Sequence, residues 1–494
     1  MQTTHTRRRD AFTGTSRMAR VIRQAWHSPT FMTWGSHTAR SLSLLAVMPL
    51  VLTRFATEEI TLWYLFVTIL SLQALADFGF VATFTRVIAY AMGGAKQLKD
   101  YREIVSVQSS GKPNWKTIAA ITATMRAVYG KLTFILVVLL GVIGTLAFWH
   151  PISRVEEQTV AWAAWGVILL TSAIYFRGNL FVAYLQGVNE IALLRRWEAL
   201  TLLGAAATSV LVLLFNGDLL ALVLANQVWH LIRVVGNRQL SRSVQDGRFK
   251  EFHKTKVVPE VFASVWPAAW RSGLGVFMSR GLIEASGLIF AQLGSSAAVA
   301  SYLIALRLIQ ALSMYSQAPF YTKLPTLARL RAEGRLEQQI QVAHKGMQYA
   351  YWTFVLGFIT LGILAEPLLR LIGSNADFVS LALWSIMGLA FMVERYGAMH
   401  LQLYSTTNHI IWHIANGVSG FIYLLVSLLL FRIVGVYAFP IGILLGYLGF
   451  YAWYAAIHSY RAFKLNFWQF ERSTSLIPGT VLLVYIIGSA YFHL

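Results

Sequence analysis

Long apolar stretches, separated by short polar segments, make up most of this chain. From residue 36 onward, stretches of 18 or more mostly apolar residues recur, and Leu132 to Phe148 is one example of a nearly solid apolar run. About 20 such residues in a helix span the hydrocarbon core of a bilayer. A membrane β-barrel would instead alternate apolar and polar residues over about ten positions. The pattern therefore predicts an all-α polytopic membrane protein.

The composition agrees with a membrane protein and excludes several other classes. Of the 494 residues, 56% are hydrophobic and 13% are charged, whereas soluble domains carry about 25% charged residues. The absence of cysteine excludes disulfides and thiolate metal sites. The net charge of +20 is explained by basic loops of a polytopic protein. No basic soluble domain is present, so nucleic-acid binding is not expected.

Span counting predicts twelve transmembrane helices and a short thirteenth, arranged as two six-helix lobes. We divide the chain into a basic N-terminal segment (1–35), an N-terminal lobe (36–236), a linker loop (237–264), a C-terminal lobe (265–458), and a final loop with the thirteenth helix (459–494). The predicted spans are 36–54, 60–90, 121–149, 159–186, 198–215, 218–236, 265–292, 296–320, 347–369, 380–404, 409–432, 434–458 and 477–493.

Basic residues gather in alternate loops and predict the orientation. The N-terminal segment and the loops 91–120, 237–264 and 321–346 hold most of the Lys and Arg residues. The loops of the other set hold only Arg54, Arg154, Arg370 and Arg432. By the positive-inside rule, the N-terminus is expected in the cytoplasm. Leu327, Leu330 and Leu336 suggest a surface helix in the last basic loop.

Six arginines lie inside the apolar stretches, where a charged side chain is expensive. An arginine at the bilayer centre costs about 2.5–3.5 kcal/mol on insertion scales. Folding does not require this cost at six positions, so we interpret the set as a site for an anionic substrate that enters the membrane. Arg271, at the mouth of another stretch, is added to it. The six are Arg40, Arg86, Arg177, Arg280, Arg307 and Arg395.

Arginine is well suited to a phosphate or diphosphate, because its planar guanidinium donates two parallel hydrogen bonds and keeps its charge. Position within the spans puts three of the six near the cytoplasmic leaflet and three near the midplane. The first three are Arg40, Arg86 and Arg177, and the second three are Arg280, Arg307 and Arg395. The competing interpretation is snorkelling, in which a guanidinium near a helix end reaches interfacial water. It applies most to Arg86 and Arg177.

Three acidic residues in the apolar stretches are candidate counter-charges or coupling-ion ligands. Glu284 is four residues after Arg280 and could pair with it on one helix face. Glu394 and Arg395 are adjacent, about 100° apart on a helix, and are not expected to face each other. Asp77 precedes Gly79 and could pair with an arginine or cap a helix break there.

No catalytic or metal-binding motif is found. The chain has no phosphate-binding Gly-x4-Gly-Lys-Ser/Thr loop, no Gly-x-Ser-x-Gly elbow and no Asp-x-Asp pair. His409 and His413 are four apart but have no third ligand close by, so no metal site is predicted. No cofactor is expected apart from a coupling gradient of H⁺ or Na⁺, and the chain is not expected to be an enzyme.

The run from Ser36 to Gly94 resembles part of a known transporter family. The run Arg54-Phe55-Ala56-Thr57-Glu58-Glu59 is followed by aromatic Leu62-Trp63-Tyr64, then by Asp77-Phe78-Gly79-Phe80 and Arg86. This order is similar to the first two spans of the polysaccharide-transporter (Wzx-type) branch of the multidrug/oligosaccharidyl-lipid/polysaccharide exporter (MOP) superfamily. The resemblance implies a V-shaped pair of helical bundles, alternating access, and a cationic cavity that holds a lipid diphosphate. It carries this role onto Arg86 by motif and onto Arg40 by its place in the first span.

The function implied by the resemblance is a flippase. Undecaprenyl-diphosphate-linked oligosaccharide, an O-antigen or exopolysaccharide unit, would move from the cytoplasmic to the periplasmic leaflet of the bacterial inner membrane. Its partners would be the lipid bilayer and the polysaccharide polymerase machinery. Two alternatives remain open: a multidrug/cation antiporter of the same superfamily, which should have a carboxylate-rich site, and a membrane polymerase or ligase using the same carrier, which should have a sizeable external loop.

Overall fold

The computed structural model describes residues 24–56, 58–60, 62–63, 66–67, 76–77, 79–95, 112–153, 155–293, 296–371 and 378–492. Within them, side chains are described except at 44–45, 52, 150, 276–277, 279–293, 296–300 and 490–492. The described part is helical, without strands. The all-α fold predicted from the apolar stretches is therefore confirmed.

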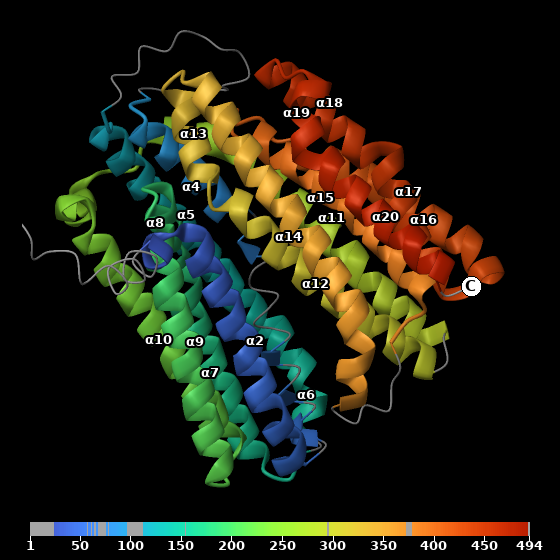
Figure 1. Cartoon of the computed structure of the whole chain (residues 1–494). Helices are drawn as coiled ribbons and strands as arrows, with labels where there is room; N and C mark the ends of the chain where they lie inside the picture. The colour runs from blue at the N-terminus through green and yellow to red at the C-terminus, as the bar shows by residue number, and fades with distance from the viewer. Residues whose placement is uncertain are drawn as a thin grey trace, which may run out of the picture.

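Two lobes of packed helices form the molecule (Figure 1). The N-terminal lobe contains α2 (Pro29–Arg54), α4 (Phe80–Met92), α5 (Trp115–Leu139), α6 (Thr145–Ser153), α7 (Gln158–Arg177), α8 (Asn179–Gly187), α9 (Ile191–Leu214) and α10 (Leu219–Ser243). The C-terminal lobe contains α11 (Pro259–Leu293), α12 (Ser296–Tyr321), α14 (Leu336–Leu371), α15 (Leu381–Ser405), α16 (Trp412–Val434), α17 (Ala438–Gly446), α18 (Ala452–Phe463), α19 (Phe467–Glu471) and α20 (Ile477–Phe492).

Shorter elements connect these helices. The π-helical segments are η1 (Leu140–Gly144), η4 (Tyr447–Tyr451) and η5 (Arg472–Leu476), and the 3-10 segments are η2 (Gln245–Lys254) and η3 (Gly435–Tyr437). The surface helix expected in the last basic loop is α13 (Leu324–Ala332). We call the end of the molecule where α13 lies the α13 end.

Seven helical segments of the described chain are long and apolar enough to cross a membrane. One of them, Trp412–Phe463, is 52 residues long and turns back at Gly435, whose φ is +58°. Another, Phe467–Ser489, overlaps the thirteenth predicted span, 477–493. Three further helices, α2, α12 and α15, have 25 or 26 residues and each carry an arginine of the predicted set. The chain is thus a multi-pass membrane protein.

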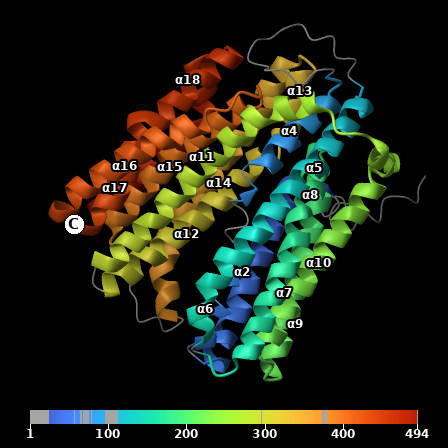
Figure 2. The same ribbon diagram turned by 180° about the vertical axis from the view of Figure 1, so that it is seen from behind.

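Figures 1 and 2 show that the lobes lie together at the α13 end and diverge away from it. The inter-lobe contacts join α4 to α11 and α13, α5 to α11, and α2 to α12. Trp34 Nε1 donates to the carbonyl of Tyr315 at 2.9 Å, and the hydroxyls of Thr30 and Thr322 are 3.3 Å apart. The V shape expected from the resemblance is present, with its closed point at the α13 end.

A break before α4 lets the two lobes approach closely. Gly79 begins α4 with a φ of +74°, in the left-handed region that favours glycine. A Cβ placed on Gly79 would lie 2.6 Å from the Cβ of Ser272 and 2.9 Å from the amide nitrogen of Gly273 on α11. The Asp77 carboxylate accepts a hydrogen bond from the Val81 amide at 2.9 Å. The expected cap at a Gly79 break is confirmed.

Candidate functional site

Two arginines without a described acidic partner, Arg86 and Arg271, lie where α4, α11 and α16 meet. Gly275 of α11 lies against the first turn of α16, because a Cβ at Gly275 would be 2.6 Å from that of Trp412. Arg86 approaches the same turn from the N-terminal lobe, with its guanidinium carbon 5.9 Å from the centre of a Trp412 ring. This junction therefore contains residues of both lobes.

Arg86 is buried without a counter-charge. Only 4% of it is exposed, its Nη2 donates to Thr83 Oγ1 at 3.2 Å, and its Nε has no hydrogen-bond partner. Among the described residues, no carboxylate lies within ion-pair distance of it. A buried charge without a partner is strongly unfavourable, so this position favours a bound anion.

Arg271 is a second cation beside the same helix turn. It is half-buried, its guanidinium carbon is 5.6 Å from the ring centre of Trp270, and its Nε has no hydrogen-bond partner among the described residues. Trp270 in turn packs against His413, with ring centres 5.3 Å apart. Arg271 acts electrostatically on His413. Two arginines from different lobes thus flank the first two residues of α16.

The start of α16 adds a helix terminus to these two arginines. No side chain caps it, since the residue before it is Ile411. The first amides of a helix lack partners within the helix, and its dipole favours an anion there. The indole Nε1 of Trp412, which is buried, and Nδ1 of His413 also lack hydrogen-bond partners. The Arg86–Arg271–α16 junction can therefore offer several donors to one anionic group.

Three other arginines of the predicted set are exposed. Arg40 forms an ion pair with Glu198 of α9, with 3.0 Å between Nη2 and Oε1, and its side chain is 51% exposed. Arg177 ends α7. Arg307 donates to Gln310 Oε1 at 3.3 Å on α12. The structure does not bring these three into the junction.

Arg395 is buried inside the C-terminal lobe, and its relation to Glu394 differs from our expectation. Nη2 of Arg395 lies 3.3 Å from a carboxylate oxygen of Glu394 and donates to the carbonyl of Ser313 at 2.9 Å. The expectation that the neighbours do not face each other was wrong. An arginine side chain is long enough to reach across the 100° between adjacent helix positions and fold back toward the carboxylate.

Asp77 is held by neutral donors. Besides the Val81 amide, the Tyr129 hydroxyl donates to it at 2.8 Å and the Asn179 amide at 3.5 Å. It is 7% exposed, and no arginine of the described residues forms an ion pair with it. The side chains of Arg280 and Glu284 lie outside the described residues, so their expected pairing stays a prediction.

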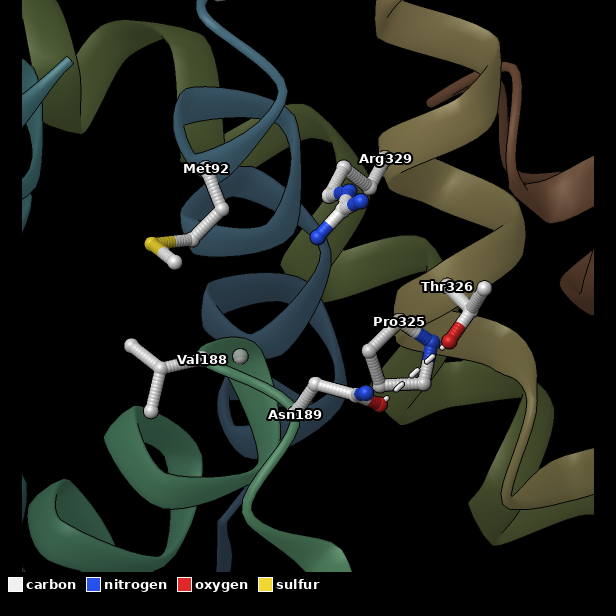
Figure 3. Close-up of a pocket in the computed structure, with 7 residues that line it drawn as sticks. Met92, Val188, Asn189, Pro325, Thr326 and Arg329 are labelled. Carbon is white, nitrogen blue, oxygen red and sulfur yellow. Dashed lines mark hydrogen bonds between the residues drawn. The ribbon is translucent and has the colours of Figure 1, made fainter. Parts of the chain in front are cut away.

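A small crevice lies between the lobes at the α13 end (Figure 3). Met92, Val188 and Asn189 line it from the N-terminal lobe, and Pro325, Thr326 and Arg329 from α13. The Thr326 hydroxyl donates to Asn189 Oδ1 at 3.3 Å. The crevice has a volume of about 20 Å³, which has room for one water molecule. It is a gap in the contact between the lobes and is too small for a substrate.

Two features of the site were missed by sequence reasoning. One is Glu198, which also pairs with Arg195 on its own helix. The three-residue spacing between Arg195 and Glu198 could have predicted that pair. Trp412 was not predicted as a site residue, and nothing in its local sequence signals the contact with Arg86. These residues are far apart in the chain, and only the fold brings them together.

No family model matches the sequence, and no curated protein matches it. Solved structures are similar in fold. An outward-facing multidrug resistance MATE family transporter of the MOP superfamily aligns with a TM-score of 0.69 and 11% identity, covering 90% of this chain and 98% of that one. A Vibrio cholerae MATE transporter gives 0.63 and 13%, covering 92% and 98%.

A MOP superfamily transporter from Pyrococcus furiosus, described as having a binding pocket of reverse polarity, gives a TM-score of 0.66 and 11% identity, covering 90% and 98%. At these identities the likeness shows the fold alone. The fold expected for the MOP superfamily is thus confirmed, while the Wzx-type branch stays a prediction.

Proposed function

We propose that this protein is an alternating-access transporter that flips an undecaprenyl-diphosphate-linked oligosaccharide across the bacterial inner membrane. The V shape supports alternating access, because two lobes joined at one end can rock about that contact and expose a central site to either side. The solved transporters with the same fold support transport as the general activity.

The proposed direction follows from charge. The α13 end carries described basic residues that include Arg329, Arg331 and Arg335, and the positive-inside rule assigns these to the cytoplasm. On this assignment the N-terminus is cytoplasmic. The lobes are then closed toward the cytoplasm and apart toward the periplasm, which is the state that releases a flipped headgroup.

The observation that carries the substrate assignment is the unpaired positive charge of Arg86 and Arg271 beside the start of α16. A diphosphate is the part of a lipid-linked oligosaccharide that these donors fit. Because the junction lies near the cytoplasmic end, it would engage the diphosphate soon after loading. Arg40, Arg177, Arg280, Arg307 and Arg395 remain proposed ligands for other stages of the passage.

Coupling to H⁺ or Na⁺ is part of the proposal, with Asp77, Glu284 and Glu394 as candidate ligands. No other cofactor is proposed. Delivery to polysaccharide polymerase machinery would follow release in the periplasmic leaflet.

A multidrug antiporter is the second candidate, and the MATE transporters among the similar structures favour it. A cationic drug would need carboxylates at the junction. Among the described residues there, arginines have no acidic partner, which favours an anion. The reverse polarity described for the Pyrococcus furiosus transporter accords with one fold serving pockets of opposite charge.

The first test is loss of the gene. We expect lipid-linked sugar units to accumulate in the cytoplasmic leaflet. They would be measured in spheroplasts as the sugar that a label added outside the membrane cannot reach. Finished units that still reach the periplasm would contradict the flippase proposal, and a gain in drug sensitivity without sugar accumulation would support the antiporter.

The second test is Arg86→Gln in the complemented deletion strain. Loss of a charge-assisted contact costs about 1.5–3 kcal/mol, so we expect flipping to fall by about tenfold or more at unchanged protein level. Arg370→Gln is the matched control, since Arg370 is exposed and pairs with Glu366. Equal activity of the two variants would remove the diphosphate role of Arg86.

A further inference from the structure

A buried Glu–His pair in the C-terminal lobe is not used by the proposed function. Glu471 and His400 are both fully buried, and His400 Nε2 is 3.0 Å from Glu471 Oε1. The Tyr460 hydroxyl donates to the same oxygen at 2.9 Å, and the Ser475 hydroxyl donates to the other carboxylate oxygen. The Tyr396 and Tyr460 hydroxyls are 2.7 Å apart. The carboxylate is therefore fully engaged by donors.

The last membrane-crossing segment of the described chain, Phe467–Ser489, supplies this carboxylate, and we call it the thirteenth segment. Glu471 ends α19, just before the π-helical η5, and α20 follows directly. His400 lies on α15 and Tyr460 on α18, so the pair joins the added C-terminal helices to two helices of the lobe. π-helical turns inside helices are frequent at functional sites. A twelve-span protein ending after α18 would lack the acid.

The charge of the pair depends on one proton. With neutral His400, the buried cluster carries the net negative charge of Glu471; with protonated His400, the pair is neutral. No Lys or Arg is a described hydrogen-bond or ion-pair partner of Glu471. The other titratable groups that act on it are Tyr351 and His344 of α14 and Tyr396 of α15. His400 Nδ1 has no hydrogen-bond partner.

The two helices that contact Glu471 through His400 and Tyr460, α15 and α18, both reach the contact between the lobes. Six residues after His400, the carbonyl of Thr406 accepts a hydrogen bond from Tyr90 of α4 at 2.6 Å. Two residues after Tyr460, the carbonyl of Ala462 accepts from Arg331 of α13, which packs on α4. A shift of α15 or α18 near the pair would therefore displace residues at the α13 end, where the lobes are in contact.

We propose that Glu471 and His400 form a proton-binding site, built with the thirteenth segment, whose occupancy controls the closure of the two lobes at the α13 end. The protonated pair is neutral and holds α15, α18 and α19 together. Loss of the proton leaves a buried negative charge, which the protein relieves by loosening this end. The inference rests on the proposed alternating access, although not on the identity of the substrate.

Spin labels on the full-length protein in liposomes test this, because the chain has no native cysteine. Ser243→Cys and Gln338→Cys put labels on exposed positions at the α13 ends of α10 and α14, one in each lobe. We expect the closed-distance population to fall several-fold when the pH is raised from about 5.5 to about 8.5, because loss of the bound proton leaves a buried negative charge.

Glu471→Gln keeps the shape of the side chain and removes its charge, so the closed population should no longer change with pH. His400→Gln should have the same effect and serves if Glu471→Gln does not fold. Glu366→Gln, at an exposed ion pair, is the matched control and should respond like the parent.

A parent protein without a pH response, or a response retained in Glu471→Gln and His400→Gln, would overturn the inference. A pH response in a protein that moves no lipid-linked oligosaccharide would instead overturn the substrate proposal and leave the proton site standing.

Discussion

The arginines of the apolar stretches separate into paired and unpaired side chains. Arg40 and Arg395 each lie beside a carboxylate, whereas Arg86 is buried with a hydroxyl and an aromatic ring as its partners. The sequence predicts that arginines enter the membrane region, because that depends only on local composition. It does not predict which are neutralised, since the Arg40–Glu198 pair spans 158 residues.

Asp77 offers a test at the same scale that separates a structural role from an ion-coupling role. Asp77→Asn keeps an oxygen that can cap α4, whereas Asp77→Ala removes it and should lower the free energy of unfolding by about 0.5–2 kcal/mol. If Asp77 binds the coupling ion, Asp77→Asn should retain the thermal stability of the parent and lose transport. Measured together, melting temperature and flipping rate decide this; an active Asp77→Asn variant would rule out the coupling role.

Helices were the most predictable elements. Most predicted spans correspond to helices because an apolar stretch of sufficient length specifies a membrane helix by itself. The largest differences are extensions outside the membrane: α14 has 36 residues and starts at Leu336, well before the predicted span at 347. Its first turns are polar and are stabilised by packing on α13, which apolar span counting does not detect.

The Gly79 break in α4 is expected to tolerate no side chain. Gly79→Ala would put a methyl group 2.6 Å from Ser272 and would force a left-handed residue, at a cost of roughly 1–2 kcal/mol. We expect α4 and α11 to separate, so that the closed-distance population of the Ser243→Cys/Gln338→Cys labels falls at every pH.

Gly334→Ala is the control for Gly79→Ala, because Gly334 also has a positive φ (+73°) but has nothing within 4 Å of a new Cβ. Its backbone strain is comparable while its inter-lobe clash is absent. If both variants changed the lobe distance equally, the close approach at Gly79 would not matter.

The two lobes can be cross-linked at the contact between α2 and the end of α12. Thr30 of α2 and Thr322, which directly follows α12, have hydroxyls 3.3 Å apart, and the chain has no cysteine to interfere. We expect Thr30→Cys/Thr322→Cys to form a disulfide under oxidation, to hold the lobes together at the α13 end and to stop transport. A reductant should restore it, and either single substitution should stay active. Transport by the oxidised double variant would argue against rocking of the lobes.

The position of the contact between the lobes also determines how far the opposite ends of the helices move. The contact between the lobes, which includes Gly79 against Ser272 and Gly273 and also α4 against α13, would act as a fulcrum toward the α13 end of the long helices. At 1.5 Å per residue, a 36-residue arm such as α14 is about 54 Å long. A rotation of about 10° at the fulcrum would then swing its far tip by about 9 Å. Replacement of one small side chain, or exchange of one proton, near the contact would therefore cause a much larger displacement at the far ends of the helices. That displacement would move an oligosaccharide headgroup.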